Sequence, residues 1–362
     1  MLAEAIYKIR KPGERLPQVY LHQSSYGYSS CLFAYYLRQV EGLHDVEEQK
    51  SLEIGSMVHE LWLRHHVRAI LEPLQAGVDF DDLNLARQQY EAFLTARIKS
   101  EDDRAEIVAT AVRMVEALRT RQFVDPIAVE ASFGEFKKGE KLVPVVNLVT
   151  GEVAEGVFVS GRVDLVERIH DHPKLKSGTV GISDLKTCQQ VPKEPDDPSY
   201  VLNSLQLLLY SYASLVLAAD GKDGAKGTQI GSIIHVGKTK TETRIARSIG
   251  KFGEADYVRL YLSMAERGQR LQLARLMWER TGRDPRRAME FYSQNLSKCR
   301  GFIDECPFMR TVCFRDSYPN GGELFRETIR RRKSFATGTP LHLITGVPEI
   351  ADELIVEFDE EE

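Results

Sequence analysis

The pattern of the sequence changes near Asp125 and Pro126, and this change constrains the fold more than any other feature. Before it, apolar residues recur at helical spacing. The predicted helices cover residues 24–43, 55–71, 81–98 and 103–123. After it, runs rich in β-branched residues are separated by Gly, Lys or Pro, which predicts consecutive strands. The predicted strands cover residues 127–136, 141–148, 155–169 and 179–187.

The segment after these strands predicts a helix packed on the sheet. Residues 191–200 form a proline-punctuated loop, and residues 202–220 form a strongly apolar helix. A further strand is predicted over 227–239, followed by helices over 254–282 and 284–295. A helix that crosses between strands is typical of proteins that carry helices on the faces of a sheet. We therefore predict an α/β (α+β) fold with a central mixed β-sheet flanked by helices.

The charge and hydropathy of the chain exclude some classes of protein. The 362 residues include 48 Lys and Arg against 53 Asp and Glu, which gives a net charge of −5. This balance argues against a broad, non-specific nucleic-acid binder, but metal-binding carboxylates are themselves acidic. Transmembrane helices need about 18 consecutive apolar residues, and the sequence has no such run. The N-terminus lacks the apolar core of a secretion signal, so we expect a cytoplasmic protein with no membrane partner.

Two carboxylates and a lysine are expected to meet on neighbouring strands. Side chains alternate across a strand, so Asp184 and Lys186 share one face of the segment 179–187. Asp164 lies on the preceding strand, and a hairpin between the two strands could bring the acids together. Such carboxylates repel each other unless a cation lies between them, and oxygen ligands suit Mg²⁺ or Mn²⁺. Spacing alone leaves a second interpretation open, in which the acids end their strands and Lys186 is an ion-pair partner.

Three further polar residues lie on predicted helices. His59 belongs to the helix over 55–71, and Gln206 and Tyr210 are four residues apart on the apolar helix over 202–220. Residues with this spacing share one helical face. Taken singly, a histidine or tyrosine on an apolar helix is more often part of a packed core than of a site.

Four short motifs follow one another along the chain. They are G-x-x-x-H ending at His59, G-R-V-D ending at Asp164, D-L-K-T beginning at Asp184, and Q-x-x-x-Y beginning at Gln206. In this order they resemble the PD-(D/E)xK nuclease superfamily, and in particular its RecB-like branch, with the CRISPR-associated and phage iron–sulfur exonucleases. The resemblance implies a restriction-endonuclease-like core. It also implies a Mg²⁺- or Mn²⁺-dependent deoxyribonuclease acting on single-stranded DNA or DNA ends.

The resemblance also implies a role for each matching residue. The implied metal ligands are His59, Asp164, Asp184 and the main-chain carbonyl of Leu185. The implied catalytic lysine is Lys186, and Gln206 and Tyr210 are expected to help hold the substrate and the geometry of the site. Glu130 is similar to the acid that the family carries on an upstream strand. DNA is the implied partner, with recombination or CRISPR-adaptation proteins as further partners.

The cysteines predict a second metal site. Cys299, Cys306 and Cys313 have six residues between neighbours, and Cys31 and Cys188 lie far away in the sequence. By count, four thiolates suit zinc and an iron–sulfur cluster equally well, and either distant cysteine could be the fourth ligand. The resemblance implies a 4Fe–4S cluster held by Cys31 and the three C-terminal cysteines, with Cys188 outside it. A cluster that closes so long a loop is expected to be structural.

These interpretations lead to one prediction for the domains and two rival functions. We predict a single RecB-like nuclease domain over 1–362, in which residues 20–45 with 296–316 form an iron–sulfur cap. Residues 56–295 form the nuclease core, and residues 317–362 are a tail without an assigned role. The rivals are a non-catalytic module that binds DNA ends and a zinc-stabilised adaptor of a recombination or CRISPR-adaptation complex. A binding module would have no need of the acids and the lysine, which argues against the first rival.

Overall fold

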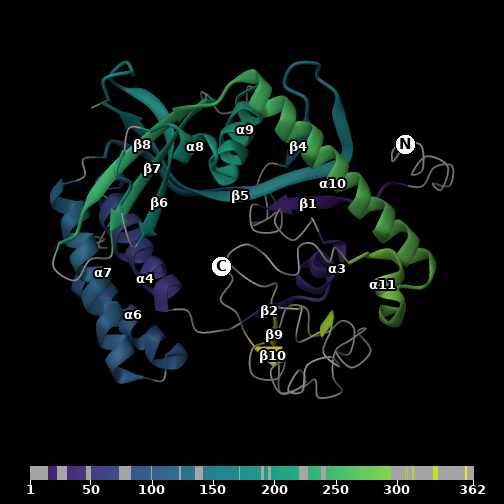
Figure 1. Ribbon diagram of the computed structural model, residues 1–362, viewed down its shortest axis with the longest axis horizontal. Coiled ribbons are helices and arrows are strands. Elements are labelled where there is room, and N and C mark those ends of the chain that lie inside the picture. Colours follow the sequence, from purple (N-terminus) through teal and green to yellow (C-terminus); the bar gives the residue numbers. More distant parts are fainter. Residues whose placement is uncertain are drawn as a thin grey trace. The chain divides into compact units, whose positions relative to one another are not determined.

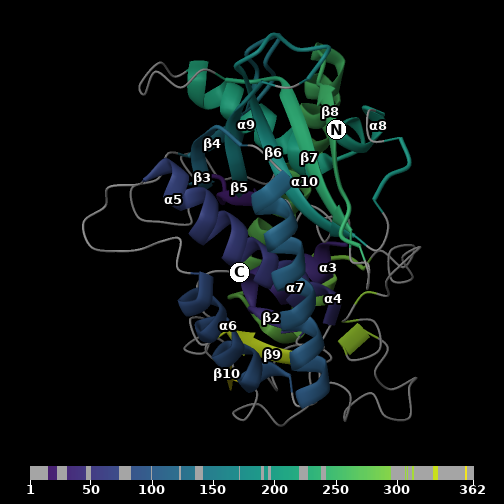
Figure 2. The same ribbon diagram turned by 90° about the vertical axis from the view of Figure 1, so that its left-hand side faces the viewer.

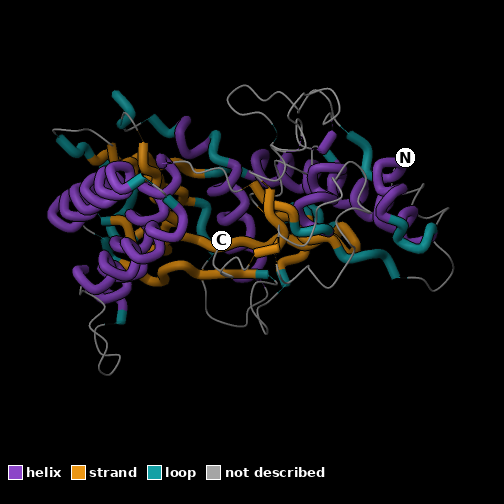
Figure 3. Tube along the Cα trace, turned by 90° about the horizontal axis from the view of Figure 1, so that it is seen from below, coloured by secondary structure: helices purple, strands orange, loops and turns teal. Residues whose placement is uncertain are grey.

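The computed structural model describes most of the chain, and Figure 3 draws the remaining residues in grey. The described residues are 15–22, 31–45, 50–72, 83–98, 100–121, 124–134, 142–170, 172–188, 191–194, 197–219, 227–237, 242–294, 306, 308, 312–313, 329–332 and 355–356.

The α-helices are α3 (Leu32–Tyr35), α4 (Lys50–Val58), α5 (Arg68–Leu71), α6 (Leu83–Arg97), α7 (Glu101–Arg121), α8 (Ser199–Leu202), α9 (Leu205–Ala219), α10 (Glu254–Arg280) and α11 (Ala288–Phe291). Two π-helices, η1 (Tyr36–Val40) and η2 (His59–Val67), and the 3-10 helix η3 (Pro285–Arg287) complete the helical part. The strands are β1 (Val19–His22), β2 (Leu43–Asp45), β3 (Pro126–Phe133), β4 (Val143–Val146), β5 (Val153–Ile169), β6 (Thr179–Cys188), β7 (Ile230–Gly237), β8 (Ile245–Lys251), β9 (Ile329–Arg332) and β10 (Ile355–Val356). Along the described chain, helices α4 to α7 precede a run of four strands, β3 to β6, and α8 and α9 then lead to β7 and β8 (Figure 1).

The chain divides into two compact units. The first comprises residues 1–47, 153–158 and 262–362, and the second comprises 48–152 and 159–261. The main sheet has the strand order β1-β5-β6-β7-β8, with β3 and β4 also paired to β5. Strand β6 is antiparallel to β5 and parallel to β7, and β8 returns antiparallel to β7. The parallel pair requires a crossover, and the chain makes it through α8 and α9.

Helices cover both faces of the sheet in the second unit. Residues of β7 alternate in direction, since a Cβ at Gly231 would touch Val201 of α8 and Leu207 of α9, whereas Ile234 packs among residues of α4 and α7. Figure 1 accordingly shows α9 on one side of β6 and β7 and helices α4 and α7 on the other. Figure 2 views the same helices from the side of α6 and α7.

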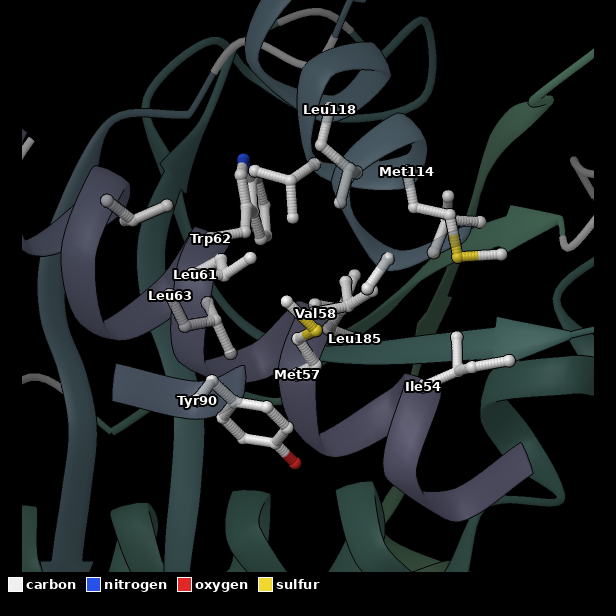
Figure 4. Close-up of a cluster of buried hydrophobic side chains, with 14 of the residues drawn as sticks. Ile54, Met57, Val58, Leu61, Trp62, Leu63, Tyr90, Met114, Leu118 and Leu185 are labelled. Carbon is white, nitrogen blue, oxygen red and sulfur yellow. The ribbon is translucent and has the colours of Figure 1, made fainter. Parts of the chain in front are cut away.

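The core of the second unit joins these helices to the strands that carry the site. Apolar side chains of α4, η2, α6 and α7 pack against Val129 of β3, Leu165 of β5 and Leu185 of β6. Figure 4 shows Leu185 beside Met57 and Val58 of α4. All three side chains are essentially excluded from solvent. Burying an aliphatic side chain of this kind contributes about 1.5–3 kcal/mol, so these contacts fix the position of β6.

The first unit has a core rich in aromatic residues. Tyr36 of η1 packs edge-on against Trp278 of α10, with ring centroids 5.3 Å apart, and tilts against Tyr292 at 4.9 Å. The Gln272 side-chain amide donates to the main-chain oxygens of Pro17 and Glu155 over 3.1 and 2.7 Å. A small sheet also belongs to this unit, in which β9 pairs with β2 and β10. These contacts tie the segment before β1, the start of β5 and the C-terminal half of α10 together.

The structure confirms the predicted α/β architecture and corrects several boundaries. In the described part of residues 24–43, only 32–40 are helical, and Gly42 follows at a φ of 69° that suits glycine. The helix expected over 284–295 is reduced to η3 and α11, within 285–291. Strand β8 was not predicted, because Ser248 and the glycine at 250 are buried and break the alternation of apolar and polar residues. None of the helices in the described part of the chain combines the length and apolar character needed to cross a membrane.

Candidate active site

Three acids lie side by side on adjacent strands. The antiparallel register pairs Leu165 of β5 with Ser183 of β6, which places Asp164 opposite Asp184. On the other edge of β5, Val129 pairs with Leu165 and Ala131 with Val163, which places Glu130 of β3 beside Asp164. Side chains directly opposite each other share a face of the sheet. The hairpin that the sequence suggested therefore brings the two predicted acids together and adds a third.

His59 is the first residue of the π-helix η2, and its ring reaches the end of β6. Its Nε2 donates to the main-chain oxygen of Leu185 over 2.9 Å, and we assign the proton to Nε2 because a carbonyl only accepts. Its Nδ1 lies 3.8 Å from Asp164 Oδ2. Burial lowers the pKa of His59, so the neutral ring keeps a lone pair on Nδ1. A histidine that donates its other ring nitrogen to a backbone carbonyl is typical of metal ligands.

Asp184 is a buried carboxylate that lies beside the Lys186 ammonium. Its exposed fraction is 1%. The Lys186 ammonium lies 3.0 Å from Oδ2, yet neither oxygen of Asp184 receives a hydrogen bond of ordinary geometry from the described residues. Burial, followed by the nearby charge of Asp164, raises the pKa of Asp184 to about 7. Burial also raises the pKa of Asp164, whose Oδ2 accepts from the main-chain amide of Leu185 over 3.1 Å.

The lysine is held by residues from the helix on the same face. Lys186 Nζ donates to Gln206 Oε1 over 3.0 Å, and Gln206 Nε2 donates to the Tyr210 hydroxyl over 3.2 Å. Tyr210 packs edge-on against Phe133 of β3, with ring centroids 5.9 Å apart. Burial raises the pKa of the Tyr210 hydroxyl, so this group stays protonated at neutral pH. A chain of polar contacts therefore links Asp184, Lys186, Gln206 and Tyr210. It orients the half-exposed ammonium of Lys186 beside the acids.

A glycine makes this packing possible. A Cβ at Gly161 would lie 2.8 Å from the Phe133 ring and 2.8 Å from the Tyr210 ring. Contacts this short do not occur between a real Cβ and a neighbouring carbon, so a larger residue would displace one of the two rings. The glycine of the G-R-V-D segment therefore has a packing role three residues before Asp164.

Glu130 lies at the site with a strained backbone conformation. Its φ is 51°, a value that is uncommon for residues other than glycine. Its Oε2 accepts from Arg64 Nε over 3.1 Å and lies 3.2 Å from Arg162 Nε. Strain of this kind persists only where the surroundings hold it, and it is concentrated at functional sites. The sequence carried one signal for Glu130, its place on the upstream strand, and none for its conformation.

The donor set fits a divalent cation. Ligand atoms of His59, Glu130 and Asp164 all lie within 4.8 Å of one another, and among the described residues this is the one group of three or more potential metal ligands that close together. Asp184 is not part of that group, although it adjoins Asp164. Buried carboxylates that lack donors are costly unless a cation compensates them. Carboxylate oxygens with one imidazole nitrogen suit Mn²⁺ or Mg²⁺.

The comparison with protein families agrees with this geometry. The family described as the PD-(D/E)XK nuclease superfamily matches residues 23–313. The chain belongs to the PD-(D/E)XK nuclease superfamily. None of the curated proteins matches the sequence. A solved structure titled "Crystal structure of SSO0001" is 11% identical and covers 60% of this chain and 83% of its own, with a TM-score of 0.21, and a likeness at this level carries no argument.

The superfamily gives the arrangement its chemical context. Its members are nucleases, and the sheet flanked by helices is the fold expected for them. The ligand atoms of His59, Glu130 and Asp164 lie within 4.8 Å of one another, and the carbonyl of Leu185 accepts from His59. Asp184 lies opposite Asp164 in the strand register and pairs with Lys186. Sequence reasoning gave Glu130 less weight than its position at the site warrants. The individual roles of these residues remain predictions.

The cysteines predicted to hold a cluster belong to the first unit or lie outside the described residues. Cys31 is buried among Phe33, Tyr36 and other apolar side chains, and Cys306 and Cys313 pack against the same hydrophobic cluster. These three described cysteines do not form a group of ligand atoms within 4.8 Å. Cys299 lies outside the described residues. Cys188 belongs to the second unit, where its thiol lies 3.5 Å from the Val236 carbonyl oxygen.

Proposed function

We propose that this member of the PD-(D/E)XK superfamily is a Mg²⁺- or Mn²⁺-dependent deoxyribonuclease that removes nucleotides from single-stranded DNA or DNA ends. The observation that carries the proposal is the pairing of two buried carboxylates, Asp164 and Asp184, beside which Lys186 supplies a single positive charge and Asp184 accepts no hydrogen bond of ordinary geometry from the described residues. A structural role would favour donors around such a group. A cation-binding role explains why they are missing.

The proposed reaction is the hydrolysis of a phosphodiester by water. His59, Glu130, Asp164 and Asp184 would hold the cation, together with the carbonyl of Leu185. A divalent cation held there would supply positive charge to the phosphate and make a water molecule more acidic. Lys186 would place its ammonium beside the phosphorus while negative charge develops on the phosphate oxygens. Gln206 would fix the lysine, because its side-chain oxygen accepts from Nζ over 3.0 Å.

End-labelled single-stranded and double-stranded DNA, incubated with Mg²⁺ or Mn²⁺, tests the proposal. We expect shortening from the ends that stops when the metal is chelated. Lys186→Ala should reduce the rate about 10²-fold or more, because it removes a charge that stabilises the transition state. Lys176→Ala, in the exposed turn before β6, is the matched control and should cleave at the wild-type rate. Equal rates for the two variants would show that Lys186 has no part in the chemistry.

The metal requirement separates a histidine ligand from a core histidine. His59→Ala should weaken metal affinity, so a higher Mn²⁺ concentration should restore part of the activity. A variant with reduced thermal stability and an unchanged metal titration would identify His59 as a packing residue instead. Cleavage of circular DNA without free ends would contradict the exonuclease part of the proposal and leave the nuclease assignment intact.

The cluster is proposed on separate grounds. Cys31, Cys299, Cys306 and Cys313 would hold a structural 4Fe–4S cluster, which the sequence resemblance supports. Anaerobic purification followed by iron analysis tests this, and about four irons per chain is the expected result. Stoichiometric zinc would replace the cluster with a zinc site. We further propose that recombination or CRISPR-adaptation proteins bind this chain, which co-purification would test.

A further inference from the structure

A second concave site lies at the β8 edge of the sheet, outside the candidate active site. It is a cavity of about 760 Å³ within the second unit, which is within the usual size of ligand pockets. Its charged lining residues are Arg121, Lys193, Glu242, Arg244 and Arg247. Four of the five are cations. The cavity therefore presents a basic surface on a protein whose overall net charge is −5.

Arg247 is held rigidly at the inner wall of this cavity. Its Nε donates to Ser232 Oγ of β7 over 3.0 Å, and its Nη2 donates to Glu167 of β5. Glu167 and Ser232 are both fully buried. No described residue accepts a hydrogen bond from Arg247 Nη1. The register pairs Arg247 with Ile234 and Ile234 with Leu185, so the Arg247 side chain lies on the face of the sheet opposite Asp184 and Lys186. Its charge is matched by Glu167, so Arg247 shapes the cavity wall and leaves the ligand to the other cations.

The other cations give the cavity an excess of positive charge. Arg121, at the end of α7, donates Nη1 to the main-chain oxygen of Thr243 over 3.0 Å, so its charge is not neutralised by this contact. Arg244 lies 3.5 Å from the Glu242 carboxylate. Lys193 is exposed, and none of the described carboxylates forms an ion pair with it. Two charges, those of Arg121 and Lys193, therefore remain for a ligand.

The cavity lies within reach of the candidate active site. Lys186 of β6 pairs with His235 of β7, and His235 pairs with Ala246 of β8, which lines the cavity. Two strand spacings separate Lys186 from Ala246, which is about 10 Å. Successive nucleotides of a duplex strand rise by ~3.4 Å, so this separation corresponds to about three nucleotides.

We propose that this cavity binds a backbone phosphate of the nucleic-acid strand whose cleavage site lies at Asp184 and Lys186. The proposal rests on the proposed nuclease function for the identity of the strand. Arginine and lysine are the side chains that contact phosphates most readily, and each contact made in this way adds affinity that depends on salt. The position of the cavity then determines how far beyond the cleavage site, in nucleotides, the enzyme contacts the strand.

Oligonucleotide binding in a metal chelator tests the cavity without cleavage. The double variant Arg121→Gln with Lys193→Gln should bind a labelled single strand about tenfold more weakly than wild type, and the salt dependence of log K should fall by about 2. Glu242→Gln should act in the opposite direction and tighten binding. The matched control is Lys174→Gln with Lys176→Gln, which removes the same charge from the exposed turn before β6 and should bind like the wild type.

The outcomes separate this proposal from the proposed function. An unchanged salt dependence in the Arg121 and Lys193 double variant would overturn the cavity proposal, even if the protein cleaves DNA. Altered binding by a protein that never cleaves DNA would support the cavity and reject the nuclease function. Inorganic phosphate gives a further arm. If the double variant loses affinity for inorganic phosphate and for the oligonucleotide equally, the cavity contacts a phosphate of the strand. If the double variant loses affinity for inorganic phosphate alone, the cavity is a site for free phosphate and the proposal is overturned.

Discussion

Replacing Asp184 with asparagine should stabilise the metal-free protein while it removes the activity. The carboxylate is buried, lacks hydrogen-bond donors and lies beside Asp164, so its ionised form is unfavourable in the fold. Its pKa is about 7 in the folded protein against an ordinary value of 3.8. At 1.36 kcal/mol for each pKa unit, this difference sets an upper limit of about 4 kcal/mol on the stability that the fold loses by ionising Asp184. Because Asn keeps the shape but gives up the ion pair with Lys186, we expect a smaller gain, on the order of 2 kcal/mol.

The sign of the effect follows from the direction of the pKa shift. A carboxyl whose pKa is raised by folding destabilises the protein when it is ionised. For Asp184 this cost is absent below the ordinary value, grows between 3.8 and about 7, and is constant above that. The stabilisation by Asp184→Asn should therefore appear in chelator near pH 8 and disappear near pH 4.

Urea unfolding in chelator at both pH values measures this gain. Asp125→Asn is the matched control, because a hydrogen bond from His170 lowers the pKa of Asp125, and its loss should not stabilise the protein. Refutation would come from an Asp184→Asn protein that is no more stable than wild type near pH 8. Added Mn²⁺ should reverse the order of stabilities, since only the wild type keeps the full ligand set.

Four more variants test the packing and the cluster. Leu185→Ala should lower the free energy of unfolding by about 2–5 kcal/mol, because it opens a cavity where β6 meets the helices, and urea unfolding will report it. Gly161→Ala should cost about 1–3 kcal/mol and reduce cleavage, since its Cβ would displace the Tyr210 or Phe133 ring; wild-type cleavage would argue against the packing role. Cys31→Ser should lose its iron, whereas Cys188→Ser should keep it, and the reverse result in iron analysis would reject the proposed ligand set.

The alternation of side chains along a strand predicted much of the site. It placed Asp184 and Lys186 on one face of β6, and the structure puts their charged groups 3.0 Å apart. The hairpin argument placed Asp164 nearby, and the spacing of Gln206 and Tyr210 predicted a shared helical face, along which they are hydrogen-bonded. These are local regularities of strands and helices, so the sequence carries them directly.

Other features depend on contacts between distant segments. The positive φ of Glu130 is maintained by its surroundings, including Arg64 and Arg162. A glutamate at this position of the sequence does not predict it. The π-helix that starts at His59 has the same apolar spacing as an α-helix, so periodicity does not separate the two. Strand β8 escaped prediction because the buried Ser248 and the glycine at 250 break its alternation of apolar and polar residues, and its Arg247 pairs with a glutamate of another strand, which no local pattern encodes.

Strand β6 contributes one face to the hydrophobic core and the other to the candidate active site, which limits the insertions and deletions that it can accept. Leu185 turns its side chain into the helical core while its carbonyl oxygen accepts from His59, and both neighbours face the opposite layer. Deletion of a single residue before Asp184 within β6 would shift the register by one residue, so that Asp184 and Lys186 would face the core and Leu185 would face the site. Insertions should thus be tolerated in the turn between β5 and β6, where residues 173–177 lie at the surface, and be lethal to activity a few residues later. A deep insertion scan of this hairpin would record that boundary as an abrupt change within a single strand.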